Sequence, residues 1–333
     1  MGHRWGMTVP FAGVPLAEHG RLYAALHDAG FTDLWSSEVA GADAFTPLTV
    51  AALTVPRMRL GTAVAPVFTR GPALLAMTAA ALAETAPGRF ALGIGASSPV
   101  VVGDWNAVPF TDPFRRSRDM LRFLRAALRG ETVDAAFDTF TVRRFRLERL
   151  PATPPPILLA ALRPGMLRLA AAEADGVILN WLAAGDVARA RAALGETPDG
   201  FEIAARIFVC PTEDADHARA VGRRLITAYL TVPAYAAFHR WLGNGDVLGP
   251  VWEAWAAGDR RAALAAVPDA LVDQLILHGS PRRCREQILA YVEAGVTTPV
   301  IAPLPAPDTG AGPAEAVAAL AADLSAPATA ARG

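Results

Sequence analysis

Residues 57–99 read RMRLGTAVAPVFTRGPALLAMTAAALAETAPGRFALGIGASSP, a stretch that predicts strand, loop, helix, strand and loop in that order. The runs 59–64 and 89–95 are short and apolar, as strands buried on both faces are. Between them, Pro72 suits the first turn of a helix, and the pair Pro87-Gly88 ends it. Two parallel strands joined by a helix form a βαβ unit, so the loops after both strands lie at one edge. Parallel α/β folds bind ligands at that edge.

Strands and helices of the same kind alternate along the rest of the chain. Further strands are expected at residues 7–11, 33–37, 157–161, 176–180, 201–210 and 296–303. The apolar face of the helix in the opening stretch is expected to consist of Leu74, Leu75, Met77, Thr78 and Leu82 and the alanines between them. Eight strands alternating with helices predict a (β/α)8 TIM barrel with helical insertions, and an open doubly wound sheet is the alternative.

The expected barrel accounts for one domain over residues 1–304. Segments longer than a simple crossover predict insertions near residues 100–112, 131–150 and 229–272. The second of these alternates enough to form a hairpin, and the third is expected to be helical. Residues 305–333 are expected to form a Pro/Gly linker and a tail with a helix at 314–324.

Composition and charge narrow the classes of function. The 333-residue chain is 53% hydrophobic, carries a net charge of −1 and contains scattered arginines but no lysine. This argues against nucleic-acid binding and excludes a Schiff-base lysine or a P-loop. Cys210 and Cys284 are far apart in the sequence, so no metal site is expected. No apolar run of about 18 residues and no leader-like beginning is seen, so we expect a cytoplasmic protein without a membrane partner.

The carboxyl ends of the expected strands hold few groups for acid–base chemistry. They offer one carboxylate, two serines, an arginine and an asparagine, but no histidine, cysteine or lysine. The candidates are Glu38; Ala63 and Val64; Gly95, Ala96, Ser97 and Ser98; Ala161 and Arg163; and Asn180 and Trp181. Small residues and backbone suit a large flat ligand that brings its own reactivity, so the sequence predicts a cofactor site.

Each polar candidate also has an ordinary structural interpretation. Glu38 could hydrogen-bond a cofactor ring or donate a proton, or it could form a salt bridge. Arg163 precedes Pro164-Gly165 at a helix start, so it could bind an anion or simply be exposed. The loop 95–99 could approach a phosphate or form a tight turn, and it lacks the third glycine of a dinucleotide motif. Trp181 could line a pocket or only pack.

Five motifs spread over nearly the whole chain resemble the luciferase-like monooxygenase superfamily, and in particular its branch of oxidoreductases that depend on coenzyme F420, a deazaflavin. They are DLWSSEVAGADAFTPL (33–48), RLGTAVAPVFTRGPALLAM (59–77), GRFALGIGASSPVVVGDWN (88–106), PPILLAALRPGMLRLAAAEADGVILNWL (155–182) and GSPRRCREQILAYVEAGVTTPVIA (279–302). Together they are specific for the superfamily, and they distinguish F420 from FMN less well.

The resemblance implies a barrel of the bacterial luciferase type, with the cofactor ring lying over the carboxyl ends of the strands. It places a bulge with a non-proline cis peptide at Ala63-Val64, behind the deazaflavin. Glu38 matches an acidic position near the ring. The residues that match the phosphate side of the cofactor are Gly95, Ala96, Ser97 and Ser98 in one loop, and Arg163, Gly165 and Met166 at one helix start.

The implied function is hydride transfer between C5 of F420 and a small organic substrate. Phe68, Asn180 and Trp181, with the insertion 229–272, are expected to shape the substrate pocket. One alternative is an FMN-dependent monooxygenase that uses reduced flavin and O2. The other is a non-catalytic barrel that only binds the cofactor. The helical insertion and the alanine-rich helices also predict a homodimer, which is common in the resembling family.

Overall fold

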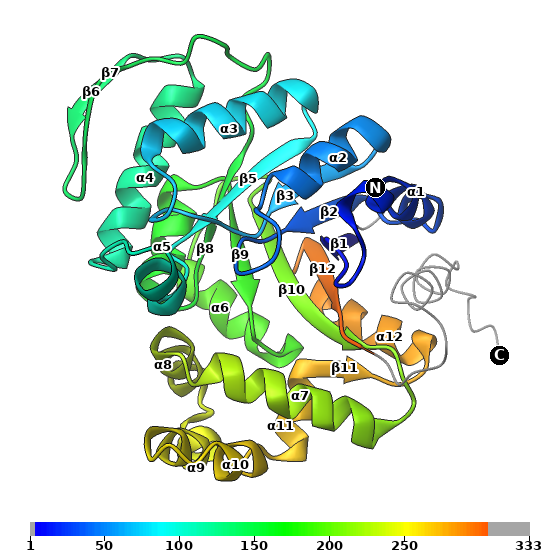
Figure 1. Cartoon of the computed structure of the whole chain (residues 1–333). Helices are drawn as coiled ribbons and strands as arrows, with labels where there is room; N and C mark the ends of the chain where they lie inside the picture. Colours follow the sequence, from blue (N-terminus) through cyan, green and yellow to red (C-terminus); the bar gives the residue numbers. More distant parts are fainter. Residues whose placement is uncertain (1–3, 306–333) are drawn as a thin grey trace.

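Eight parallel strands form a closed barrel in the computed structural model, which describes residues 4–305 (Figure 1). They are β1 (Gly6–Val9), β2 (Asp33–Ser36), β3 (Arg59–Thr62), β5 (Phe90–Gly95), β8 (Ile157–Ala160), β9 (Gly176–Asn180), β10 (Glu202–Cys210) and β12 (Thr298–Pro303). Their order around the barrel is β12, β1, β2, β3, β5, β8, β9 and β10, and the pairing of β10 with both β9 and β12 closes the ring. The predicted (β/α)8 barrel is therefore confirmed, and the open doubly wound sheet is wrong.

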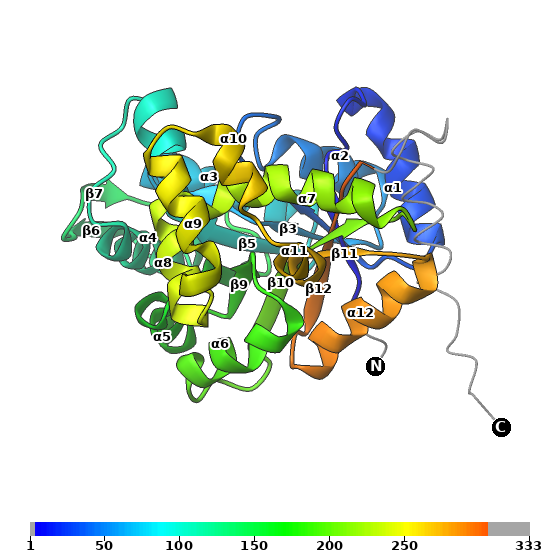
Figure 2. The same ribbon diagram turned by 90° about the horizontal axis from the view of Figure 1, so that it is seen from below.

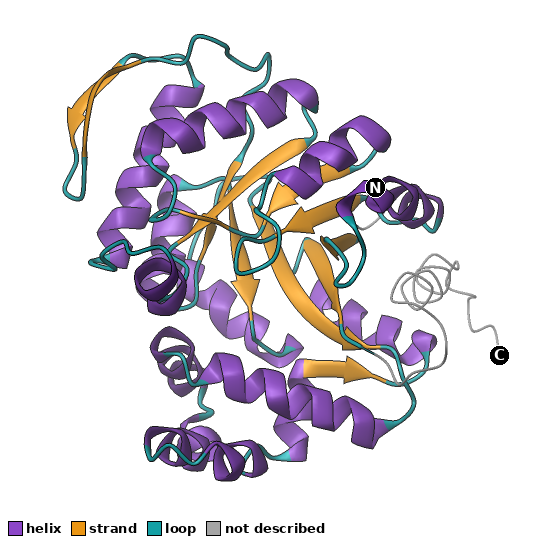
Figure 3. Ribbon diagram, in the orientation of Figure 1, coloured by secondary structure: helices purple, strands orange, loops and turns teal. Residues whose placement is uncertain are grey.

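Helices surround this barrel and follow most of its strands (Figure 3). They are α1 (His19–Asp28), α2 (Thr46–Thr54), α3 (Pro72–Thr85), α4 (Pro113–Leu128), α5 (Pro164–Glu173), α6 (Val187–Leu194), α7 (Ala215–Leu230), α8 (Pro233–Leu242), α9 (Gly245–Ala256), α10 (Arg260–Ala265), α11 (Asp269–Leu275) and α12 (Pro281–Glu293), with the short turns η1 (Leu16–Glu18), η2 (Val100–Trp105) and η3 (Ala184–Asp186). Proline opens α3, α4, α5, α8 and α12, where its missing N–H costs no hydrogen bond.

Trp35 fills the middle of the barrel, where neighbouring strands leave room for its ring. A Cβ on Gly61 would lie 2.4 Å from the indole, and one on Gly6 would lie 2.9 Å from it. The ring packs against Ile178, Val300 and other apolar side chains that point inward. Glycine on the strands beside Trp35 therefore allows one large side chain to pack the barrel centre.

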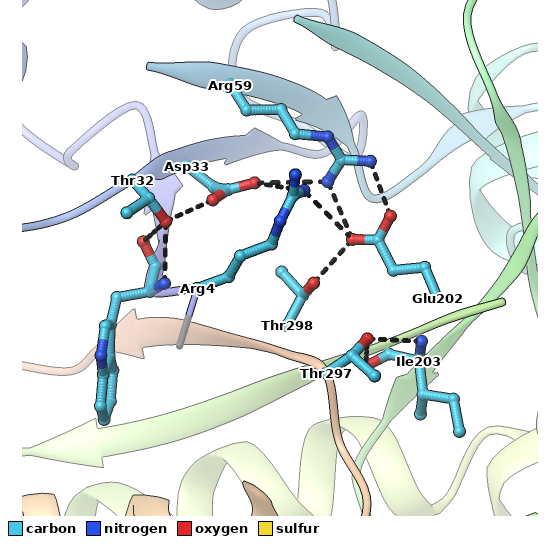
Figure 4. Close-up of polar contacts among 9 residues, drawn as sticks. Arg4, Thr32, Asp33, Arg59, Glu202, Ile203, Thr297 and Thr298 are labelled. Carbon is cyan, nitrogen blue, oxygen red and sulfur yellow. Dashed lines mark hydrogen bonds and ion pairs between the residues drawn. The ribbon is translucent and has the colours of Figure 1, made fainter. Parts of the chain in front are cut away.

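An ion cluster closes the amino end of the barrel (Figure 4). Arg59, at the start of β3, donates from Nη1 to Oε1 of Glu202 (2.8 Å) and from Nη2 to Oε2 (2.6 Å). It also donates to Asp33 at the start of β2 (3.3 Å), and Arg4 donates to the same Asp33 oxygen (3.3 Å). Thr298 Oγ1 donates to Glu202 (2.7 Å). Strands β2, β3, β10 and β12 are thus joined by charged groups at this end.

The chain departs from the simple alternation in three places. The predicted hairpin within 131–150 is confirmed as β6 (Val133–Ala136) and β7 (Thr141–Phe145), which project beside α4 (Figures 1 and 3). The short β4 (Ala65–Pro66) follows β3 and pairs with β5. Between β10 and β12 the helices α7 to α11 form a separate layer, seen from below in Figure 2, and end in β11 (Ile276–His278). This strand pairs with β10 and was not predicted, because it lies in a mostly helical stretch.

The apolar face predicted for α3 is partly wrong. Leu75 and Leu82 are buried, but Leu74 is 50% exposed and Met77 is 49% exposed. The predicted alanines Ala76, Ala79 and Ala80 are buried as well, and so is Ala83. The buried face of α3 therefore consists of small alanines with two leucines, and Leu74 and Met77 point outward.

The single-domain division at residues 1–304 and its insertions near 100–112 and 229–272 stay predictions. The helix expected at 314–324 lies outside the described residues, as does nearly all of the expected tail at 305–333. Within residues 4–305, no helix has both the length and the apolar character needed to cross a membrane.

Candidate active site at the carboxyl end of the barrel

Strand β3 ends in a bulge beside β5. Gly61 pairs with Ala91 and Ala65 pairs with Ile94, so four steps along one strand match three along the other. The extra residue falls at Ala63-Val64, whose peptide bond is cis. The predicted bulge with a non-proline cis peptide is therefore confirmed at this position.

Two glycines of β5 let the bulge approach that strand. A Cβ on Gly93 would lie 1.9 Å from the carbonyl oxygen of Thr62, and one on Gly95 would lie 2.9 Å from Cγ2 of Val64. The buried Thr62 hydroxyl donates to the Gly93 carbonyl (2.7 Å) and accepts from the Gly93 N–H (2.8 Å). The side chain of Thr62 thus takes the place of ladder hydrogen bonds that the bulge interrupts.

A small cavity, partly open to solvent, lies toward the carboxyl end of the barrel in front of this bulge. It is lined from β1, β2, β9, β10 and β12 and from the residues after β2 and β3: Thr8, Trp35, Ser36, Ser37, Ala63, Ile178, Ala204, Arg206 and Val300. Among the predicted cofactor residues, Ala63 borders it directly. The polar members of this lining are Thr8, Ser36, Ser37 and Arg206.

Glu38 follows β2 and lies next to the bulge, because its N–H donates to the Val64 carbonyl (3.4 Å). Its carboxylate accepts from Nη2 of Arg70 (2.7 Å) and from the N–H of Ala44 (3.1 Å). Arg70 in turn lies 4.8 Å from the centre of the Phe45 ring. The salt-bridging interpretation of Glu38 is therefore realised in the structure, and its side chain does not line the cavity.

The loop after β5 and the start of α5 lie on adjacent barrel strands. Ser97 adopts a positive φ of 65°, and Ser98 Oγ accepts from the N–H of Val101 (3.3 Å). Arg163 precedes α5 as its N-cap residue and is exposed, and no side chain caps the helix. Within residues 4–305 its guanidinium forms no hydrogen bond or ion pair. Gly165 and Met166 lie in the first turn, so this helix start keeps free N–H groups for an anion.

The predicted pocket residues Phe68 and Trp181 do not line the cavity. The ring of Phe68 is buried against Phe110, with centroids 4.9 Å apart. Trp181 is 1% exposed and packs between Phe208 (4.2 Å) and Tyr229 (5.1 Å). Phe68 therefore belongs to the core, and Trp181 separates the barrel from α7.

The carbonyl of Trp181 fixes a buried histidine of α8. His239 Nε2 lies 2.9 Å from that oxygen, and burial lowers the pKa of His239 to about 4. The imidazole is therefore neutral at pH 7 and donates to the carbonyl. This contact joins the end of β9 to the helical layer.

Arg206 and Asn180 lie side by side on β10 and β9. Asn180 Nδ2 donates to the Tyr235 hydroxyl (3.0 Å), and Asn180 Oδ1 is buried without a partner among the described residues. Ala161, by contrast, is buried after β8 and uses its N–H to bond the Ile178 carbonyl (3.1 Å). Asn180 thus has an unused acceptor beside Arg206, although it does not line the cavity itself.

Sequence reasoning missed Arg206, Thr8 and the tyrosines of the helical layer. The sequence feature that could have identified Arg206 is the strand EIAARIFVC, residues 202–210. Glu202 and Arg206 are the charged residues of this otherwise apolar strand, and their even spacing places them on the same face. Charged residues at inward positions of a barrel strand indicate the two ends of its interior. Among residues 4–305, no group of three or more His, Cys, Asp or Glu side chains is placed to hold a metal ion.

Comparison with known proteins identifies relatives of this chain. Residues 3–298 match the profile described as luciferase-like monooxygenase. A Mycobacterium tuberculosis protein, provisionally named as a coenzyme F420-dependent oxidoreductase, is 30% identical over 90% of this chain and 95% of its own. The 5,10-methylenetetrahydromethanopterin reductase of Archaeoglobus fulgidus is 27% identical over 81% of this chain and 84% of its own.

A solved structure shows the same architecture. The coenzyme F420-dependent tetrahydromethanopterin reductase from Methanopyrus kandleri matches with a TM-score of 0.79 at 20% identity, over 97% of this chain and 99% of that one. At this identity the likeness shows the fold. The family profile, in contrast, spans nearly the whole sequence and includes the bulge, the β5 loop and the start of α5. The chain is therefore an enzyme of the luciferase-like monooxygenase family.

Proposed function

We propose that this enzyme is a coenzyme F420-dependent oxidoreductase that transfers a hydride between C5 of the deazaflavin and a small organic substrate. The observation that carries the proposal is the bulge at Ala63-Val64, which borders the cavity at the carboxyl end of the barrel. The name of the Mycobacterium tuberculosis relative, which specifies coenzyme F420, supports F420 over FMN.

The residues at this end of the barrel fit such a cofactor. Ala63 presents a small side chain and backbone to a flat ring, and the loop Gly95, Ala96, Ser97 and Ser98 lets a ligand approach the main chain. Free N–H groups at the start of α5, together with Arg163, would hold the phosphate of the cofactor tail. When bound, the deazaflavin supplies the hydride-carrying carbon, and the protein supplies orientation.

Glu38 enters this proposal as a positioning residue. Its carboxylate accepts hydrogen bonds from Nη2 of Arg70 and from the Ala44 N–H. It fixes residues 38–44 beside the bulge, at the edge of the cavity. We expect Glu38→Gln to raise KM for the cofactor and to leave the pH profile of kcat unchanged. A lost acidic limb in that profile would instead assign proton transfer to Glu38.

The test is a titration of the purified enzyme with F420 and, separately, with FMN, following ligand fluorescence. We expect F420 to bind at least tenfold tighter than FMN. Arg163→Ala should weaken F420 binding about tenfold, because a charge-assisted contact to a phosphate is worth roughly 1.5–3 kcal/mol. Arg168→Ala, an exposed arginine one turn further along α5, is the matched control and should bind as the parent does.

Two outcomes would contradict the proposal. Tighter binding of FMN, with O2 consumption when reduced FMN is supplied, would favour the monooxygenase. Binding of neither cofactor would remove the cofactor assignment and leave the fold. If F420 binds, its visible absorption reports the hydride transfer. A candidate alcohol that reduces F420 should bleach this absorption, and an unsaturated acceptor that oxidises the reduced cofactor should restore it.

The predicted homodimer also stays a proposal. Leu53 on α2 and Leu74 and Met77 on α3 are large apolar side chains with 73%, 50% and 49% exposure, and these helices contact each other. A second copy of this face would cover them. Light scattering should give a dimer mass for the parent, and Leu53→Glu with Leu74→Glu should give a monomer. A monomeric parent would contradict the proposal.

A further inference from the structure

Arg206 lies inside the barrel at the edge of the cavity, on strand β10. It pairs in register with Asn180 on one side and with Val300 on the other, and its guanidinium carbon lies 4.9 Å from the centre of the Phe208 ring. Most of the side chain is buried, and its Nε has no hydrogen-bond partner in residues 4–305. Burial lowers the pKa of Arg206, but an arginine keeps its charge at any physiological pH.

This buried cation has no counter-ion within the described chain. No carboxylate in residues 4–305 lies within ion-pairing distance of Arg206, and the groups that act on it are the phenols of Tyr229, with which its side chain forms a hydrogen bond, and of Tyr235. Burial raises the pKa of Tyr235 to about 12, so that phenol is neutral at pH 7. The other inward-facing arginine, Arg59, bonds two carboxylates. A buried charge without a counter-ion is costly, so its retention beside a cavity points to an anion that comes from outside.

The barrel order places this cation opposite the bulge. Strand β10 is four positions from β3 in either direction around the eight-stranded ring, so Arg206 and Ala63 line the cavity from opposite sides. In the proposed function, one face of the deazaflavin rests on the bulge at Ala63-Val64. Its other face then points toward β10, which is the side on which a substrate must lie to exchange a hydride.

We propose that Arg206 binds the carboxylate of an organic acid substrate on the open face of the deazaflavin. This inference rests on the proposed function and deepens it by naming the substrate class. The planar guanidinium presents two donors in the geometry that a carboxylate accepts. The unpartnered Oδ1 of Asn180 lies beside it and takes a hydroxyl or N–H donor of the same molecule. The cavity that Arg206 lines is small, which limits the acid to a few carbons.

The experiment measures the binding of lactate and pyruvate, and of the uncharged lactamide and pyruvamide, by calorimetry to enzyme with and without F420. We expect each acid to bind the F420-loaded parent at least tenfold tighter than its amide. Arg206→Gln should abolish that preference, and Arg206→Lys should keep part of it. Arg224→Gln removes an exposed arginine of α7 and should behave as the parent. Circular dichroism confirms that each variant is folded.

The outcomes separate this inference from the proposed function. Unchanged F420 affinity in Arg206→Gln, with acid binding lost, supports both. Acid binding that depends on Arg206 in an enzyme that binds no F420 supports the anion site and removes the cofactor assignment. Equal binding of acids and amides, or no binding of either, overturns the anion site. Arg206→Gln that weakens F420 instead of the acids would place the cofactor, not the substrate, at this cation.

Discussion

The ion cluster at the amino end of the barrel offers a quantitative test of how these strands are held. We consider Arg59→Met, which removes the guanidinium and keeps much of the apolar stem. Arg59 and Glu202 are each 14% exposed at the side chain, and Asp33 is 1% exposed. The substitution leaves both carboxylates buried, with Arg4 as their remaining cation. Arg4 is 45% exposed, so its contribution is screened by solvent.

The expected loss follows from this burial. Breaking a buried ion pair by removing one partner costs about 3–5 kcal/mol, because the other charge stays buried and uncompensated. Arg4→Met breaks a more exposed contact and should cost about 0–1 kcal/mol. The double variant Arg59→Met with Glu202→Met removes both buried charges of the bidentate pair. It should therefore be more stable than Arg59→Met alone.

The loss should also depend on pH. Burial alone raises the pKa of Glu202, but the hydrogen bonds and charge of Arg59 outweigh it and hold this pKa below its ordinary value. Without Arg59, burial prevails and the folded pKa rises above the unfolded one. A carboxyl with a raised folded pKa stabilises the fold at low pH and loses that contribution as pH rises. The gap between parent and Arg59→Met should thus be smaller at pH 5 than at pH 8.

Equilibrium urea unfolding, followed by tryptophan fluorescence and circular dichroism at both pH values, measures these free energies of unfolding. A loss below about 1 kcal/mol in Arg59→Met at pH 8 would refute the argument, since that is the worth of an exposed pair. Equal losses in Arg59→Met and Arg4→Met would refute it as well. A gap that widened toward pH 5 would show that Glu202 and Asp33 do not take up the protons.

Two further predictions concern the other end of the barrel. Burial lowers the pKa of His239 from 6.5 to about 4, so as pH falls the unfolded chain binds a proton at this histidine before the folded protein does. Between pH 6.5 and pH 4 this group should therefore lower the free energy of unfolding by about 3 kcal/mol. The urea midpoint of His239→Gln should fall less over that pH range than the midpoint of the parent. A Cβ on Gly93 would lie 1.9 Å from the Thr62 carbonyl oxygen, so Gly93→Ala should lower the free energy of unfolding by about 3 kcal/mol and weaken F420 binding, whereas Gly185→Ala, which meets open space, should change neither. Parallel pH dependence in His239→Gln, or a fully stable Gly93→Ala, would contradict these two arguments.

The barrel could be predicted from sequence because each of its strands is a short apolar run bounded by turn residues. Every predicted strand ends within two residues of the observed one. The bulge at Ala63-Val64 followed from the family resemblance, since nothing in the letters RLGTAVAP marks a local insertion. β11 was missed because three apolar residues between two helices carry no periodicity that separates strand from helix.

The candidate site was harder to predict because it depends on which way side chains point. The strand-end argument found Glu38 and Asn180, but it could not show that Arg70 occupies the Glu38 carboxylate. Phe68 and Trp181 were expected to shape the substrate pocket, and in the structure both pack against other aromatic rings. Arg206 was missed because it lies within a strand, not after it, and its burial becomes visible only when the barrel is closed.

The two inward-facing arginines show why the ends of this barrel differ in role. Arg59 at the amino end meets two carboxylates from neighbouring strands, so its charge is satisfied within the fold and contributes to stability. Arg206 at the carboxyl end faces the cavity, and no carboxylate within residues 4–305 pairs with it. A fold that carries an uncompensated cation at its open end gains stability when an anion binds there, because the ligand supplies the missing charge. The same acid that Arg206 binds should therefore protect the parent against urea, and it should not protect Arg206→Gln.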